Sequence, residues 1–104
     1  MEIKIVAKHG SIPDDVREMI EAKVSKLPRF FERTTGIQVI ANLQAPEEPH
    51  VEIKISAEHC DDFFAHDTGT NVLAAVESVI EKVERQMRRQ KEKMTDHHRG
   101  RETN

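Results

Sequence analysis

The chain has 104 residues, 37% of them hydrophobic, and its single cysteine, Cys60, excludes an internal disulfide. A chain of this length has room for one domain, because folding at this size buries roughly 65% of the unfolded surface. The unpaired cysteine fits a reducing compartment, the first residues are too charged for a signal peptide, and no apolar run approaches the ~20 residues of a membrane span. We therefore expect a soluble, cytoplasmic protein.

The net charge is −3, but the charges are unevenly distributed along the chain. Residues 1–81 contain 8 Lys and Arg against 15 Asp and Glu, a balance of −7, whereas residues 82–104 contain 8 against 4, a balance of +4. This asymmetry predicts that the C-terminal part meets an anion. The alternative is a solvated helix end, because cations near a helix C-terminus also complement the helix dipole.

The first part of the chain predicts a strand and a helix. Residues 2–8 alternate between apolar and polar side chains, which is typical of a strand. Pro13 and the carboxylate of Asp14 mark a helix start. Pro28 lacks a backbone donor, so this helix should kink or end near residues 26–27. The helix carries an apolar stripe at steps of three and four residues, formed by Val16, Ile20, Val24, Leu27 and Phe31.

The rest of the chain predicts three more strands and a long helix. Alternating polarity indicates strands at residues 37–44, 51–58 and 63–67. Residues 68–71 supply an N-cap, and the helix should run from about Val72 to about Thr95. Residues 96–104 lack apolar side chains, so we expect them to form a loose polar tail after a domain of residues 1–95.

The resulting order, β-α-β-β-β-α, indicates an α+β fold. Strands that are apolar on one face need a single cover of helices on that face. We therefore expect a four-stranded sheet with two helices packed on one face. The aromatic side chains are expected in the core between them: Phe30, Phe31, Phe63 and Phe64.

The second helix should separate an apolar stripe from a basic ridge. At 100° per residue, the core stripe comprises Leu73, Val76, Ile80, Val83, Met87 and Met94. The ridge lies roughly 150° away and comprises Lys82, Arg85, Arg89 and Lys93, with Arg88 at its edge. Long cationic side chains on a rigid helix suit phosphate neutralisation. Because the chain has no Tyr or Trp, we expect recognition of the backbone and shape of a folded RNA rather than base stacking.

The first helix repeats this arrangement, with cations opposite its apolar stripe at Lys26, Arg29 and Arg33, and with Lys23 on the flank. If both helices cover the same sheet face, their solvent sides should form one basic groove or ridge. Two alternatives remain open. The charges could be ordinary solvated side chains, because glutamates at helical spacing can pair with them, or the basic face could dock an acidic protein partner.

Two segments resemble the ribosome hibernation promoting factor and ribosome-associated inhibitor A family. Residues 74–87 (AAVESVIEKVERQM), continued by Arg89, Lys91 and Lys93, closely resemble the signature of its last helix. Residues 22–27 (AKVSKL) and 31–33 (FER) resemble the signature of its first helix. The element order matches as well, and the resemblance covers about residues 1–94.

The resemblance implies a translation inhibitor and not an enzyme. Such a protein would bind ribosomal RNA in the decoding channel of the small ribosomal subunit, where it would occlude messenger and the A- and P-site transfer RNAs. The matching RNA-binding positions are Lys23, Lys26, Arg33, Lys82, Arg85, Arg89, Lys91 and Lys93. Arg29 and Arg88 extend the patch without a matching position. We expect no cofactor, no metal, no small-molecule substrate and no membrane partner.

The chain also departs from the family pattern. Pro28 stands where the family usually keeps its helix unbroken, which bears on the placement of Arg29 and Arg33. Leu73 replaces an aromatic residue and Asn71 a usual Asp at the start of the last helix. The chain should resemble the short class of the family, without a C-terminal dimerisation domain, and we expect a monomer when it is free.

A metal or catalytic site is the weaker interpretation of the polar residues around the last turn. The candidate ligands are His59, Cys60, Asp61, Asp62, His66 and Asp67. An adjacent His and Cys cannot easily share a tetrahedral site, and no CxxC or HExxH pattern is present. A nucleophilic Cys60 would need a base. His59 and His66 are near it in sequence, but neighbouring residues on a strand point to opposite faces.

Overall fold

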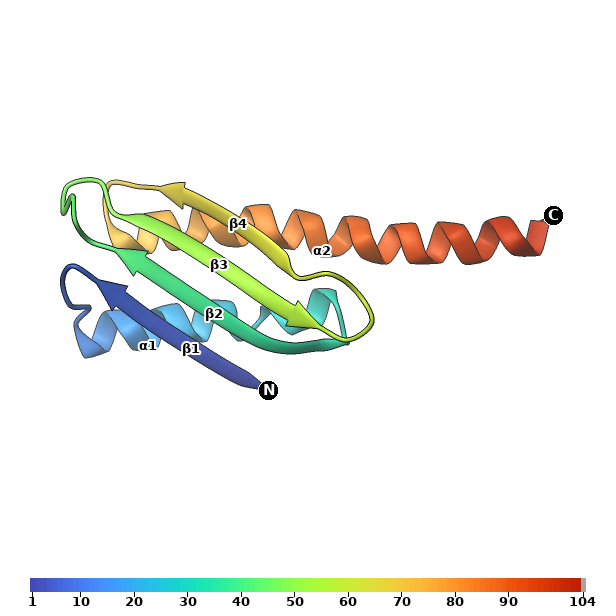
Figure 1. The fold of residues 1–104 in the computed structure, drawn as a ribbon, viewed down its shortest axis with the longest axis horizontal. Coiled ribbons are helices and arrows are strands. Elements are labelled where there is room, and N and C mark those ends of the chain that lie inside the picture. Colours follow the sequence, from blue (N-terminus) through green and yellow to red (C-terminus); the bar gives the residue numbers. More distant parts are fainter. Residues whose placement is uncertain (104) are drawn as a thin grey trace.

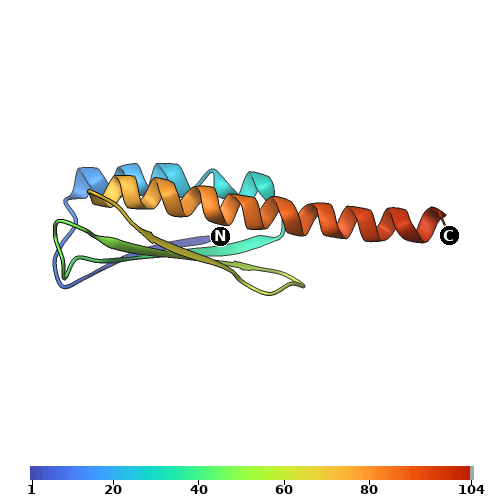
Figure 2. The same cartoon turned by 90° about the horizontal axis from the view of Figure 1, so that it is seen from above.

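The computed structural model describes residues 1–103, with the side chains of residues 1–94. The elements are β1 (Glu2–Lys8), α1 (Asp14–Val24), a 3-10 helix η1 (Leu27–Phe30), β2 (Thr34–Asn42), β3 (His50–Ala57), β4 (Phe63–Thr68) and α2 (Val72–Thr103). The sheet order is β1-β2-β3-β4, with β1 parallel to β2 and the other neighbours antiparallel. The helices cover one face of this sheet (Figures 1 and 2). The predicted α+β fold is confirmed.

The core lies between the apolar sheet face and the helices. Alternate residues of the two central strands point into it and are buried: Ile37, Val39 and Ala41 of β2, and Val51, Ile53 and Ile55 of β3. The helical layer contributes Ile20, Val24, Leu27 and Phe31, and from α2 Ala75, Val76, Val79, Val83 and Met87. Full burial of one such aliphatic side chain stabilises the fold by roughly 1.5–3 kcal/mol. The inward alternation in the strands therefore fixes the sheet against the helices.

In the structure, α2 is longer than predicted, and its buried face is rotated away from the predicted apolar stripe. Val79 is fully buried, Ile80 only flanks the core, and Met94 is 37% exposed because α2 runs past the sheet there (Figure 1). The helix continues to Thr103 rather than ending near Thr95. The side chains of residues 95–104 lie outside the described part, so a domain of residues 1–95 with a polar tail of residues 96–104 stays a prediction. Among the described residues, every helix is too short or too polar to cross a membrane.

Pro28 ends the first helix, as predicted. α1 stops at Val24, and Pro28 sits in the first turn of η1, where a residue without a backbone N–H is tolerated. The four phenylalanines occupy three environments, and Phe30 is half-buried where it packs against the core. The buried rings of Phe31 and Phe63 meet edge to face, 5.5 Å between centroids. Phe64 alternates to the open sheet face and is 47% exposed, so its predicted place in the core is wrong.

Gly69 forms the tight connection from β4 to α2, and it generates a stability prediction. A Cβ at this position would lie 2.6 Å from the backbone nitrogen of Ala75, so the backbone of α2 would have to shift. We expect Gly69→Ala to lower the free energy of unfolding by roughly 1–3 kcal/mol in urea denaturation. Gly36→Ala is the matched control, because its nearest contact would be an ordinary 3.6 Å. Equal stability losses in the two variants would contradict this account.

Candidate nucleic-acid interface

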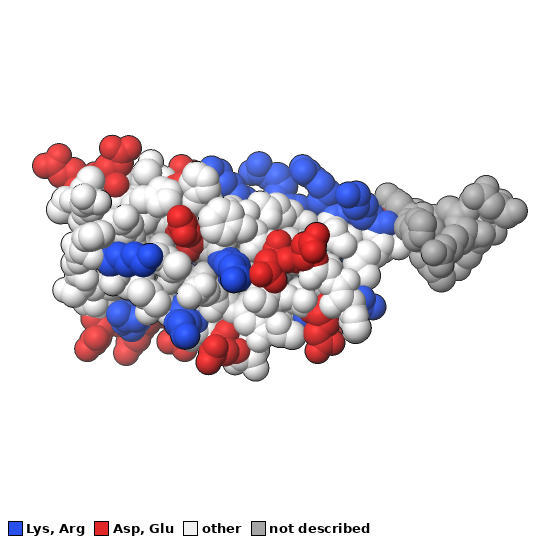
Figure 3. Space-filling model, viewed as in Figure 1, with Lys and Arg blue, Asp and Glu red and all other residues white. Residues whose placement is uncertain are grey.

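The cations predicted on α2 line its edge beside β4. Figure 3 shows Lys and Arg side chains gathered along this edge, whereas the open face of the sheet carries both signs of charge. We call Lys82, Arg85, Arg89 and Lys93 the basic edge; all four are exposed. Among the described residues, Arg85, Arg89 and Lys93 have no ion-pair partner. These three cations are therefore available to an external anion.

Lys82 has a second role, which it shares with Gln86. The Lys82 Nζ donates to the His66 carbonyl at 3.1 Å and lies 3.4 Å from the Asp67 carboxylate. Gln86 both donates to the Phe64 carbonyl, at 2.7 Å, and accepts from the Phe64 N–H, at 3.2 Å. An exposed sheet edge is a template for pairing with another chain. The two helix side chains satisfy backbone groups along the β4 edge and so block strand addition there.

Sequence reasoning missed Gln86, although its spacing held a signal. Positions four apart on a helix lie one turn, or about 5.4 Å, apart. Positions two apart on a strand lie about 6.6 Å apart. Lys82 and Gln86 can therefore reach His66 and Phe64 at the same time, provided that the helix runs along the strand.

Asp67 connects α2 to the end of β4. Its carboxylate accepts hydrogen bonds from the Ser78 hydroxyl and from the Thr68 N–H, and Lys82 lies beside it. The Ser78 hydrogen bond, then the Thr68 bond and Lys82, lower the pKa of Asp67 to about 2. Asp67 is therefore held as a carboxylate by its neighbours and is not a vacant metal ligand.

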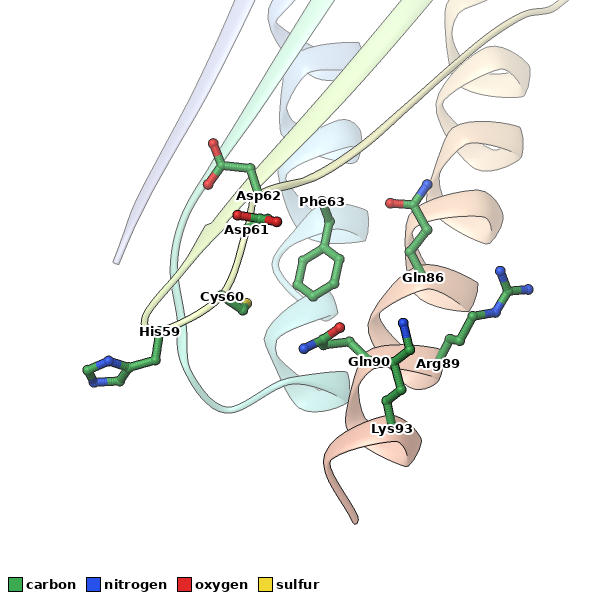
Figure 4. Close-up of a pocket in the computed structure, with 9 residues that line it drawn as sticks. All are labelled: His59, Cys60, Asp61, Asp62, Phe63, Gln86, Arg89, Gln90 and Lys93. Atoms are coloured by element: carbon green, nitrogen blue, oxygen red, sulfur yellow. The ribbon is translucent and has the colours of Figure 1, made fainter. Parts of the chain in front are cut away.

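A cleft of about 420 Å³ separates the basic edge from the β3–β4 loop (Figure 4). Arg89 and Lys93 line it from α2, and Cys60, Asp61 and Asp62 from the loop; the His59 side chain points away from the helix. Burial, followed by the Asp61 carboxylate, raises the pKa of the Cys60 thiol, which disfavours the nucleophilic thiolate. In the described part of the chain, no three His, Cys, Asp or Glu residues are placed to hold a metal.

Arg33 lies near the same end of the molecule. Its side chain is exposed, and its carbonyl accepts a hydrogen bond of 3.0 Å from the Glu58 N–H at the start of the β3–β4 loop. Its positive charge reaches Cys60, where it opposes the rise in the thiol pKa. The structure thus brings Arg33 close to the loop that faces Arg89 and Lys93, although Arg33 is more than 50 residues from these two cations in the sequence.

The groove between α1 and α2 is not basic, contrary to the prediction. A cleft of about 310 Å³ has Lys23, Lys26 and Arg29 on one wall. The other wall carries three carboxylates of α2, which we call the carboxylate row: Glu77, Glu81 and Glu84. Lys23 Nζ pairs with Glu77 at 2.8 Å. The predicted single basic groove is wrong because the α1-facing edge of α2 is acidic and its basic edge points to the other side.

Cations from both helical regions do meet at Phe30. The guanidinium carbon of Arg88 lies 4.9 Å from the centroid of the Phe30 ring, and that of Arg29 lies 5.7 Å from it. Both distances fall within the roughly 6 Å over which a cation is attracted to an aromatic face. Lys91, the last of the predicted positions, is exposed on α2 a turn further along. Arg29 and Arg88 thus meet where η1 packs against α2.

Comparison with known proteins gives one family. Residues 3–95 match the family model described as "Sigma 54 modulation protein / S30EA ribosomal protein". Similar proteins include the ribosome hibernation promoting factors of Salmonella typhimurium, at 27% identity over 93% of this chain and 100% of the relative, and of Azotobacter vinelandii, at 29% over 96% and 92%.

Solved structures share the fold. The N-terminal domain of Thermus thermophilus Protein Y has a TM-score of 0.74 and 22% identity, over 86% of this chain and 98% of that one. A ribosomal subunit interface protein from Coxiella burnetii has a TM-score of 0.75 and 19% identity, over 88% and 98%. At these identities the likeness establishes the architecture alone.

The low pKa of Asp67 predicts a stability change with pH. A carboxyl group whose pKa falls from 3.8 to about 2 on folding stabilises the fold above pH 3.8, and this contribution is lost as the pH falls towards 2. We expect Asp67→Asn to flatten the dependence of the urea midpoint on pH in this window. Asp61→Asn, on the exposed loop, is the matched control and should keep the wild-type slope. The same slope in all three proteins would contradict the assignment.

Proposed function

Because the chain belongs to the Sigma 54 modulation protein / S30EA ribosomal protein family, we propose that it is a ribosome-associated translation inhibitor. It binds ribosomal RNA in the decoding channel of the small subunit. There it occupies the space of messenger and of the A- and P-site transfer RNAs. The mechanism is occlusion, with no chemical step. The protein acts in the cytoplasm and is a monomer when free.

The basic edge is the observation that carries this proposal. Arg85, Arg89 and Lys93 are exposed on α2, with no ion-pair partner among the described residues. Each phosphate that such a cation neutralises releases condensed counterions, which drives binding to RNA. The name shared by the curated relatives, ribosome hibernation promoting factor, supports the ribosome as the target.

The remaining candidate residues contribute unequally to the proposed interface. Arg33 is exposed beside the β3–β4 loop that faces Arg89 and Lys93 and extends that surface. Lys91 is also exposed, but it lies about 200° around α2 from Arg89 and so faces away from the basic edge. Lys82 is already engaged by the His66 carbonyl and the Asp67 carboxylate, so a phosphate would have to share it with them. Lys23 must break its ion pair with Glu77 before it can bind a phosphate, and Lys26 faces the carboxylate row. We therefore propose that the RNA contacts concentrate at the overhanging end of α2 rather than along the whole groove between the helices.

Charge reversal at the basic edge tests the proposed function. The triple variant Arg85→Glu, Arg89→Glu and Lys93→Glu should weaken binding to bacterial small ribosomal subunits by on the order of 100-fold or more, because it replaces attraction to phosphates by repulsion. Co-sedimentation through a sucrose gradient at moderate salt measures the loss, and translation in a cell-free system should recover in parallel.

The matched control carries the same charge change on the open face of the sheet, at Lys4, Lys8 and Lys54. It should sediment with small subunits as the wild type does. Unchanged co-sedimentation of the basic-edge variant, or an equal loss in the control, would contradict the proposal. Capture of a partner from lysate that survives nuclease treatment would instead favour the docking of an acidic protein.

A further inference from the structure

We infer that Arg29, Phe30 and Arg88 form a binding site for an RNA phosphate, in which the phenylalanine ring holds two guanidinium groups ready for the ligand. We call these residues the arginine bracket. The inference rests on the proposed function and adds to it a specific site. Arg29 and Arg88 match no position in the family signature, and the site exists only because η1 and α2 meet.

The geometry favours an anion at this site. Two cations share one aromatic ring, at 4.9 Å and 5.7 Å from its centroid. Both guanidinium groups are permanently charged, so a phosphate that binds at this ring is attracted by both of them. The neighbouring Glu84 compensates only weakly, because its carboxylate lies 3.8 Å from the Arg88 guanidinium, whose side chain is 61% exposed. Glu81 and Glu84 also line this cleft, but among the described residues Arg29 forms no ion pair with either, so its guanidinium remains available to a ligand.

The ring makes arginine, rather than lysine, the residue suited to this site. A guanidinium that stacks on an aromatic ring uses its flat face, so the N–H donors at its rim stay free for a bidentate phosphate contact. The ring also restricts the arginine side chains before binding, so less conformational entropy is lost when the phosphate binds. Phe30 itself is fixed, because it packs against the hydrophobic core. The bracket is thus organised before any ligand arrives.

Pro28 helps to create this arrangement. It ends α1 early and starts η1, the four-residue turn that carries both Arg29 and Phe30. Phe30 then lines the same cleft as Ile80 and Glu84 of α2, one turn before Arg88. An unbroken first helix would send these residues along a different path. The proline that departs from the family pattern thereby brings a cation pair together on the side of α2 that carries the carboxylate row.

Charge-conserving variants test the bracket. Arg88→Lys and Arg29→Lys keep the positive charge but lose the planar donors and the stacking. We expect each to weaken binding to bacterial small ribosomal subunits roughly tenfold. The slope of log K against log salt concentration should stay at its wild-type value, because the number of neutralised phosphates is unchanged. Arg17→Lys is the matched control, since Arg17 donates to the Ile5 carbonyl at β1 and lies outside the site; it should bind as the wild type does.

A double-mutant cycle tests the role of the ring. Phe30→Leu should weaken binding by a similar factor, and the double variant with Arg88→Lys should be little weaker than either single variant, because both remove the same stacking. Thermal melts establish that Phe30→Leu still folds. If both lysine variants bind like the wild type while the basic-edge reversal abolishes binding, the bracket is refuted and the proposed function stands. If the wild-type protein itself does not bind small subunits, both proposals fail.

Discussion

Burial of one sheet face under α2 determines where the functional side chains can lie. Val76, Val79 and Val83 have no exposed surface, so their packing fixes the rotation of the helix about its axis. Once that rotation is set, 100° per residue decides the rest: the basic edge lies beside β4, and the carboxylate row faces α1. The separation of positive from negative surface is therefore a consequence of core packing, and a change in the core would move both.

The fold could be predicted from the sequence because polarity alternates along every strand and because Pro28 marks the break after α1. The rotation of α2 was harder to predict. Apolar residues occur at both positions 79 and 80, so two neighbouring stripes fit the same pattern, and only contact with the sheet decides that Val79 is buried. The choice between Phe63 and Phe64 depends in the same way on the register of β4.

The candidate site was predictable residue by residue, but its arrangement was not. Spacing alone places Arg85, Arg89 and Lys93 on one exposed edge, as the structure has them. A helical wheel does not say which edges of two helices meet, so it missed the Lys23–Glu77 pair, which makes the groove mixed in charge. Two further features also depend on the packing of distant segments. Gln86 reaches the β4 backbone only in the folded protein, and Arg29 and Arg88 share the Phe30 ring only there.

The overhang of α2 has a consequence for how ionic strength acts on the free protein. Arg85 and Arg89, like Arg89 and Lys93, are like-charged neighbours one turn apart, and such pairs destabilise a helix by a few tenths of a kcal/mol. Met94 is partly exposed because the sheet no longer covers this part of α2, so core packing does not offset the repulsion there. Added salt should then have two opposite effects: it weakens the proposed binding to RNA, and it screens the repulsion between these cations in the free helix. RNA bound as proposed would screen the same repulsion, so binding and helix stability would reinforce each other.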